Sequence, residues 1–473
     1  MKRLIMLAVL CAFVLSAAVA SAADIKASGA WAVEAIWKSN WGFDDNGATK
    51  SRDAGTQAFE VSQRARTIFD FVANENLKAV LYTAFGTQEW GNGAFKIGSS
   101  DDNAYTNNNY LLVKQAYLDF NWPDTDVHVR AGLQAVSLPA AFGGGSYILD
   151  EEMTAAVVSG PITDNVSYLV GYGRALDGAA GSTAKQYVDG YVAALPMSFD
   201  GFSFQPFGVY APIGAGVTAA ATQSVDGTSP MRGLASLNAT TNGGGSDFDN
   251  AYWLGAAFTM DLFDPFVLKA DINYGKVESA LKQNERSGWL FDAALEYKGM
   301  DFMTPEVFFV YTTGEDNDGN ATTDGSERMP ILAAQNWAIG SFFFGGDTLL
   351  DGSINNRKDT IGFWALGLNL KDIQSFAEGL THSATVLYAK GTNDKDAFDI
   401  ASGGHYNVAY GSTLTEKDSL IEVDFNTAYK LYDELTMTLD LGYVNLDADS
   451  SVWGTDYKGG DAWKVSTGVV YQF

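Results

Sequence analysis

The C-terminal stretch WKVSTGVVYQF, residues 463–473, alternates between two kinds of side chain along its whole length. One set is mostly apolar or aromatic and consists of Trp463, Val465, Thr467, Val469, Tyr471 and Phe473. The set between them is polar or small and includes Lys464, Ser466, Gly468 and Gln472. Successive side chains of a β-strand point to opposite faces, so this period of two predicts a strand with one apolar and one polar face.

The same alternation recurs through most of the chain. It is clear in six further segments, at residues 59–71, 127–134, 266–274, 289–298, 421–430 and 435–443. Glycine and aromatic residues are frequent throughout, and no Pro-rich or Ser-rich linker divides the chain. These features predict a single all-β domain over residues 23–473.

The connections between the predicted strands alternate between short and long. Eight short ones fall near residues 73–76, 121–126, 160–165, 197–201, 262–265, 299–302, 371–378 and 432–434. Nine long ones, rich in Gly, Asn, Asp and Ser, fall near residues 39–56, 91–108, 137–152, 176–184, 212–249, 278–285, 314–358, 391–417 and 448–460. This rhythm predicts eighteen strands with both chain ends on the short-turn side. Sixteen strands remain an alternative, because the alternation is weak near residues 153–159 and 379–390.

An even number of strands, with one rim of short turns and one rim of long loops, is the layout of a transmembrane β-barrel. A soluble sandwich would bury the apolar face of each strand against a second sheet, and similar strands with such unequal rims fit that alternative poorly. Open sheet edges find no hydrogen-bond partners in lipid, so the sheet must close. We therefore expect a closed antiparallel transmembrane β-barrel with short periplasmic turns and long extracellular loops.

The N-terminus has the pattern of an export signal. Lys2 and Arg3 precede a short apolar run over residues 4–19, and Ala20-Ser21-Ala22 follows it as a cleavage site. A membrane anchor helix is the alternative, but the run is short and ends in small residues. We expect residues 1–22 to be a cleaved signal peptide.

The composition argues against catalytic and metal chemistry. The only cysteine, Cys11, lies in the predicted signal peptide, and the chain has three histidines. Ser383 is adjacent to His382, so on a strand the two side chains point to opposite faces and do not pair. The net charge of −27 excludes nucleic-acid binding through the overall field. We expect no enzyme activity, no cofactor and no metal site, apart from weak Ca²⁺ binding at acidic loops such as residues 316–320, where the EF-hand pattern fails.

The last five residues, VVYQF at 469–473, resemble the C-terminal signal of bacterial outer-membrane barrels. Residues 113–120 and 127–133 resemble the paired fourth and fifth strands of trimeric general porins. The opening ASGAW, residues 27–31, and the composition are similar to those of the homotrimeric porins of sulfate-reducing deltaproteobacteria. The resemblance implies that Tyr471 and Phe473 form the signal that the barrel-assembly machinery recognises.

The resemblance also implies a function. It predicts a homotrimeric porin in the outer membrane of a Gram-negative bacterium, in contact with lipid and lipopolysaccharide, with a water-filled channel for passive diffusion of small hydrophilic solutes and ions. A substrate-selective channel of the sugar or anion type is an alternative, which the strand count and aromatic loops favour. A surface adhesin or structural barrel is a further alternative.

In the general porins, the loop after the fifth strand folds into the pore and faces basic residues on the wall. The corresponding segment here is residues 137–152, which carries Asp150, Glu151 and Glu152. The basic residues expected to face these acids are Arg64, Arg66 and Arg130. The alternatives are a solvated loop tip for the acids and a wall ion pair with Glu60 or Asp70 for the first two arginines. We expect these six residues to form the pore constriction.

Overall fold

The computed structural model describes residues 23–41, 43, 58–91, 111–177, 187–214, 249–280, 282, 285–316, 325–332, 337–345, 349–350, 361–398, 413–454 and 459–473. The strands are β1 (Asp24–Ser39), β2 (Ala58–Asn74), β3 (Leu77–Glu89), β4 (Leu111–Asn121), β5 (His128–Ser137), β6 (Asp150–Thr163), β7 (Val166–Asp177), β8 (Tyr187–Ala194), β9 (Met197–Phe199), β10 (Phe202–Pro212), β11 (Asn250–Phe263), β12 (Phe266–Glu278), β13 (Arg286–Tyr297), β14 (Thr304–Thr312), β15 (Phe363–Gln374), β16 (Leu380–Gly391), β17 (Ser419–Tyr432), β18 (Leu435–Asp447) and β19 (Gly459–Gln472).

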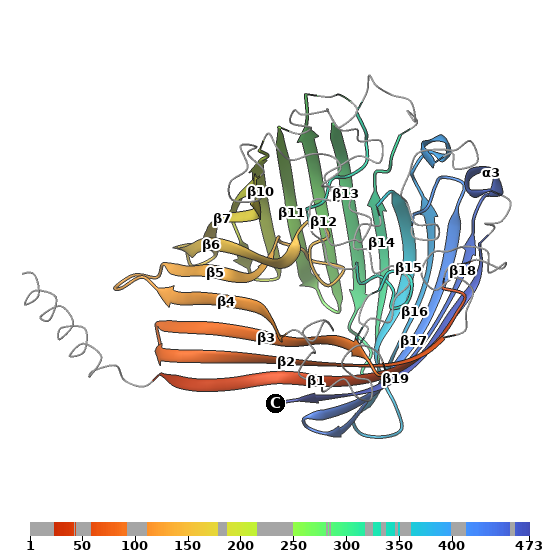
Figure 1. Cartoon of the computed structure of the whole chain (residues 1–473), viewed down its shortest axis with the longest axis horizontal. Coiled ribbons are helices and arrows are strands. Elements are labelled where there is room, and N and C mark those ends of the chain that lie inside the picture. Colours follow the sequence, from red (N-terminus) through yellow and green to blue (C-terminus); the bar gives the residue numbers. More distant parts are fainter. Residues whose placement is uncertain are drawn as a thin grey trace, which may run out of the picture.

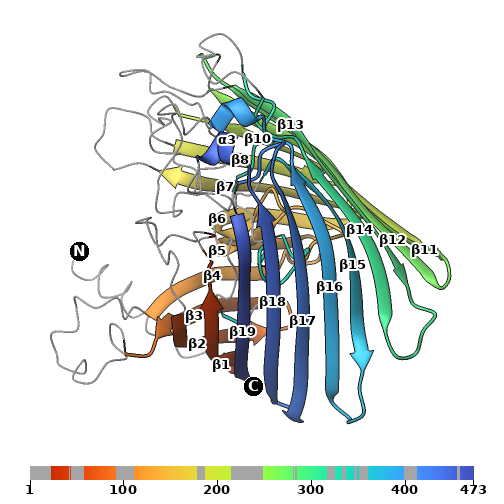
Figure 2. The ribbon, with the colours of Figure 1, turned by 90° about the vertical axis from the view of Figure 1, so that its right-hand side faces the viewer.

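These strands form one closed antiparallel sheet. Apart from β8 and β9, each strand pairs with its neighbours in the chain, and β1 pairs with both β2 and β19, so the sheet has no free edge. The wall curves round to enclose an interior, with the C-terminus beside β1 (Figures 1 and 2). Closure satisfies the backbone hydrogen bonds that an open edge would leave unpaired.

The segments β8 and β9 form one strand of the barrel. Both pair with β7 and with β10, and only Leu195 and Pro196 separate them. Proline has no N–H to donate to the ladder. The Pro196 carbonyl still accepts from the N–H of Ser167, so the pairing continues across the break. The barrel therefore has eighteen strands, which confirms the predicted number.

The two faces of the strands differ as the alternation predicts. On β18, Leu439 and Leu441 are well exposed, whereas Asp440 between them and Val444 are buried. The exposed apolar side chains lie on the outer face and the buried polar ones on the inner face of the barrel. The alternation predicts that Val423, Phe425, Leu439 and Val469 face lipid. The first three are each 40% exposed, and Val469 is half-buried.

The described residues include two short helical turns, η5 (Lys395–Phe398) and α3 (Ser450–Trp453), both in the connections on the long-loop rim. Within the described part of the chain, no helix has the length and apolar character needed to cross a membrane.

Candidate functional site: the barrel interior

The segment between β5 and β6 folds into the barrel. Leu138, Phe142 and Ile148 in this segment are buried. The carboxylate of Asp271 on β12 accepts hydrogen bonds from the N–H groups of Ala141 (2.8 and 2.9 Å) and Phe142 (3.0 Å). Because β12 is not a neighbour of β5 or β6 in the sheet, the segment reaches it only across the interior.

A second segment between β14 and β15, described over residues 325–332 and 337–345, also enters the barrel. The carboxylate of Glu422 on β17 accepts from the N–H groups of Phe342 (2.7 Å) and Phe343 (2.9 Å). Asp424, two residues along the same strand, accepts from the N–H of Ser341 (2.7 Å). These hydrogen bonds hold the segment against the inner face of the wall.

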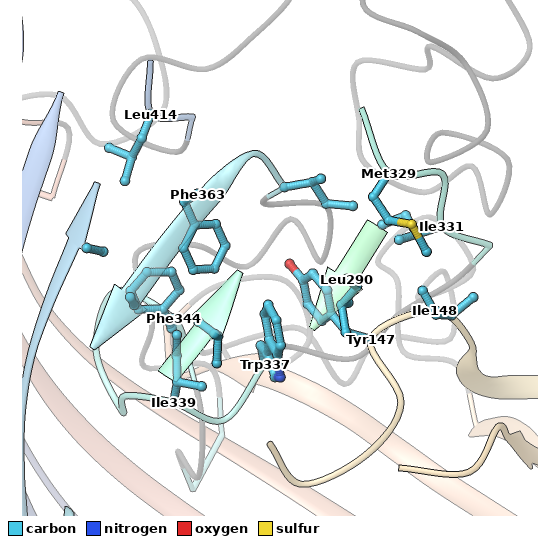
Figure 3. Packing of buried hydrophobic residues seen from close by; sticks show 14 of the residues in the cluster. Tyr147, Ile148, Leu290, Met329, Ile331, Trp337, Ile339, Phe344, Phe363 and Leu414 are labelled. Carbon is cyan, nitrogen blue, oxygen red and sulfur yellow. The ribbon is translucent and has the colours of Figure 1, made fainter. Parts of the chain in front are cut away.

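The two inward segments pack on each other. Tyr147 and Trp337 stack with 4.7 Å between their ring centroids, and Figure 3 shows them together in the centre of the cluster. The N–H of Ala338 donates to the carbonyl of Gly143 (3.0 Å). A Cβ on Gly143, which has a φ of 80°, would lie 2.3 Å from the Trp337 ring, so only glycine allows this approach. The segments therefore form one body inside the barrel.

This body is largely hydrophobic. Phe342, Phe343 and Phe344 are buried, and Phe344 and Trp337 both contact the ring of Phe363 on β15. Complete burial of a large apolar side chain contributes about 1.5–3 kcal/mol. Figure 3 shows side chains of both inward segments, such as Tyr147 and Trp337, packed near Leu290 of β13 and Phe363 of β15. The lumen beside β11–β19 is thus filled with packed side chains.

A cavity of about 800 Å³ remains between the inward segments and strands β5–β10. Its lining includes His128, Ser159 and Gln205, which lie near the short turns. It also includes Glu151 and Val188, which lie near the long loops. The cavity therefore runs lengthwise along the wall, in the direction that a solute crossing the barrel would take.

The structure corrects the expected position of the three acids. Asp150, Glu151 and Glu152 are the first residues of β6 and do not lie in the preceding loop. The three acids therefore do not share one face, because successive strand residues alternate. Glu152 forms an ion pair with Lys114 (2.8 Å). Glu151 and Glu152 are among the lining residues of the cavity.

The predicted arginines Arg64 and Arg130 contact different groups. Arg64 donates to the carbonyl of Leu349 (3.0 Å), and Arg66 lies two residues further along the same face of β2. Arg130 also lines the cavity, and its Nε lies 3.5 Å from a carboxylate oxygen of Asp119. The pore constriction stays a prediction for these residues and the three acids.

The alternative partners proposed for Arg64 and Arg66 are engaged by lysines. Glu60 forms an ion pair with Lys38 (2.6 Å), and Asp70 pairs with Lys78 (3.3 Å).

Sequence reasoning missed the carboxylates that hold the inward segments, Asp271, Glu422 and Asp424. Each occupies a polar position of an alternating strand, as many of the 57 acidic residues do. Nothing local in the sequence marks the backbone N–H groups that they bind. Of the predicted calcium loop, residues 317–320 lie outside the described residues, and no group of three or more His, Cys, Asp or Glu side chains in the described part is arranged to hold a metal ion.

The C-terminus closes the barrel. The N–H of Phe473 donates to the carbonyl of Gly29 (3.1 Å), and the N–H of Gly29 donates to the Phe473 carbonyl (3.0 Å). Tyr471 stacks on Phe473 with ring centroids 5.7 Å apart. Recognition of these two residues by the assembly machinery stays a prediction.

Comparison with solved structures identifies the fold. The outer membrane protein OpdK of Pseudomonas aeruginosa is 10% identical, with a TM-score of 0.55 over 95% of this chain and 98% of that chain. OprD of the same organism is 15% identical, with a TM-score of 0.51 over 96% of this chain and 97% of that chain. OccAB4 of Acinetobacter baumannii is 10% identical, with a TM-score of 0.53 over 96% and 99% of the two chains. At these identities the likeness establishes the fold. No protein-family model and no curated protein matches the sequence.

Proposed function

We propose that this protein is an outer-membrane channel for small solutes. The observation that supports this most directly is a closed barrel with an apolar outer face and a lengthwise cavity inside. The outer face suits lipid, and a closed wall isolates the interior from it. The barrels that share this fold include an outer membrane protein of Pseudomonas aeruginosa.

Two versions of this function differ in selectivity. A general porin passes small hydrophilic solutes and ions by passive diffusion, whereas a substrate-selective channel binds particular solutes on the way. The inward segments fill the lumen beside β11–β19 and leave a cavity of about 800 Å³, a size typical of binding sites for single small molecules. We therefore favour the substrate-selective channel over the diffusion porin.

The predicted constriction fits the same cavity in part. Glu151, Glu152 and Arg130 line it, whereas Asp150, Arg64 and Arg66 are not among its lining residues. Charges in a narrow passage act more strongly than exposed surface charges because the local dielectric is lower. We propose that Glu151 and Arg130 influence which solutes pass.

We further propose that the channel assembles as a homotrimer, as the deltaproteobacterial porins that it resembles do, and that lipopolysaccharide surrounds its outer face. Chemical cross-linking of the protein in native outer membranes tests the assembly: a trimer band supports it, and a monomer alone contradicts it.

Conductance in a planar lipid bilayer tests the function. The purified full-length mature protein should give discrete ohmic current steps, smaller than those of an open diffusion porin because the lumen is partly filled. Absence of steps from protein that migrates as a folded barrel on unheated gels would contradict a channel. An adhesin or structural barrel would give that negative result.

A further inference from the structure

Four strands each contribute one uncharged residue to a single row on the cavity lining. Val157 on β6, Gly171 on β7, Val192 on β8 and Val209 on β10 stand directly opposite one another in the strand register. All four line the cavity. We call this row of four residues the apolar strip.

The inward segments make the facing side apolar as well. Leu138, Leu149 and Leu332 line the same cavity from the segments that cross the lumen. The cavity lining therefore has apolar residues from both the wall and the inward segments, beside polar ones such as Glu151, Ser159 and Gln205.

This surface departs from the usual interior of a transmembrane barrel, which is polar where it holds water. Apolar surface left in water is unfavourable. The inner face of β2 carries Arg64 and Arg66, so the chain places charges on other parts of the wall. Hydrated ions would leave the apolar strip in contact with water. A solute with an apolar body would cover the strip and so remove its surface from water.

One polar group lies at the same level as the strip. Arg130 on β5 stands directly opposite Val157 in the register and is 38% exposed. Its Nε lies 3.5 Å from one carboxylate oxygen of Asp119, whose other oxygen lies 2.6 Å from Nε2 of His128. Its guanidinium carbon lies 5.2 Å from the centroid of the Tyr117 ring, and part of the group is exposed to the cavity. The guanidinium is thus able to donate to a solute whose body lies on the strip.

From this geometry we propose that the channel selects small solutes that have an apolar body and an end that accepts hydrogen bonds. The body contacts the apolar strip and the three leucines, and the polar end contacts Arg130. This proposal rests on the proposed channel function and assigns the class of solute to it.

Current blockade by a matched pair of glucosides tests the proposal. Phenyl and methyl β-D-glucoside carry the same sugar and differ in their apolar group. The phenyl compound should block single channels with dwell times at least about tenfold longer, the selectivity that an apolar pocket gives to added hydrocarbon. Equal dwell times in a conducting channel would overturn the proposal and leave the channel function intact. Absence of conductance would refute the channel function itself.

Two isosteric variants test whether the difference in dwell time between the two glucosides arises at the apolar strip. Val157→Thr and Val192→Thr keep the shape of the strip and add a hydroxyl, so each should reduce the ratio of dwell times several-fold. Val80→Thr is the matched control, because Val80 is buried on β3 and is not among the residues that line the cavity. A change in the control equal to that in the strip variants would overturn the assignment. All variants are first checked for folded migration on unheated gels.

Discussion

A pair of adjacent lysine substitutions on β16 tests which face of the barrel meets lipid. Val386 lies near the middle of β16 and is 50% exposed. It stands opposite Leu368 on β15 and Val423 on β17, both of which are exposed apolar residues of the outer face. Thr385, the preceding residue, stands opposite Asn369 and Asp424 on the inner face.

The two variants should differ strongly in stability. A lysine on the lipid face near the bilayer midplane costs about 2–4 kcal/mol, because the ammonium loses its hydration. Since about 1.4 kcal/mol is a factor of ten, Val386→Lys should lower the folding equilibrium constant about 30- to 700-fold. Thr385→Lys places the same charge beside the carboxylate of Asp424 and should cost much less.

Denaturant unfolding of the barrel in lipid vesicles, followed by tryptophan fluorescence, measures both variants. The expected result is a large shift of the midpoint for Val386→Lys and a small one for Thr385→Lys. Equal shifts, or a larger shift for Thr385→Lys, would refute the assignment of the two faces.

Three further outcomes are expected. Asp271→Ala removes the acceptor of the backbone hydrogen bonds from two N–H groups, Ala141 and Phe142, each bond worth about 1.5–3 kcal/mol. Single-channel conductance should therefore rise as the first inward segment loosens, and should rise less for Asp271→Asn; unchanged conductance would contradict the anchoring role. Deletion of Phe473 removes its two hydrogen bonds with Gly29 and should lower the amount of barrel in the outer membrane, measured by immunoblot, whereas normal levels would speak against the assembly signal. Replacement of the three acids Asp150, Glu151 and Glu152 by their amides should shift the reversal potential in a salt gradient toward anions. An unchanged potential would contradict their place in the constriction.

The strands were predictable because the signal for them is local. Alternation within each strand and the rhythm of short and long connections require no knowledge of distant contacts, and both appear in the barrel. The break at Pro196 shows the limit of this reasoning, since only the pairing with β7 and β10 shows that β8 and β9 form one barrel strand.

The acids of the predicted constriction were placed in a loop because the start of β6 was predicted too late in the sequence. Three consecutive acids read as a loop, because carboxylates are uncommon in strands. The register shows Asp150 paired with Ser137 and Glu152 with Ala135 at the end of β5, so the strand begins earlier than the composition indicates. Cross-strand pairing decided this boundary, and a single segment of sequence carries no information about it.

The inward segments depend on contacts between distant residues. The segment after β5 was expected from the porin resemblance, but the entry of residues 325–332 and 337–345 was not predicted. This entry depends on the stacking of Tyr147 with Trp337 and on the hydrogen bonds that Glu422 accepts from backbone N–H groups. Both join parts of the chain that are far apart in sequence. The aromatic run Phe342 to Phe344 was the one available signal, because such side chains gain most from burial.

The most direct test of the account is the accessibility of single cysteines in the conducting channel. The only native cysteine is Cys11, in the predicted signal peptide, so each variant of the mature chain carries one thiol. Val192→Cys places it on the apolar strip, and Val444→Cys places it on the inner face of β18, where the side chain is fully buried. A charged methanethiosulfonate reagent should reduce the current through Val192→Cys and leave that through Val444→Cys unchanged. Block of Val444→Cys with no effect on Val192→Cys would show that solutes cross elsewhere in the barrel.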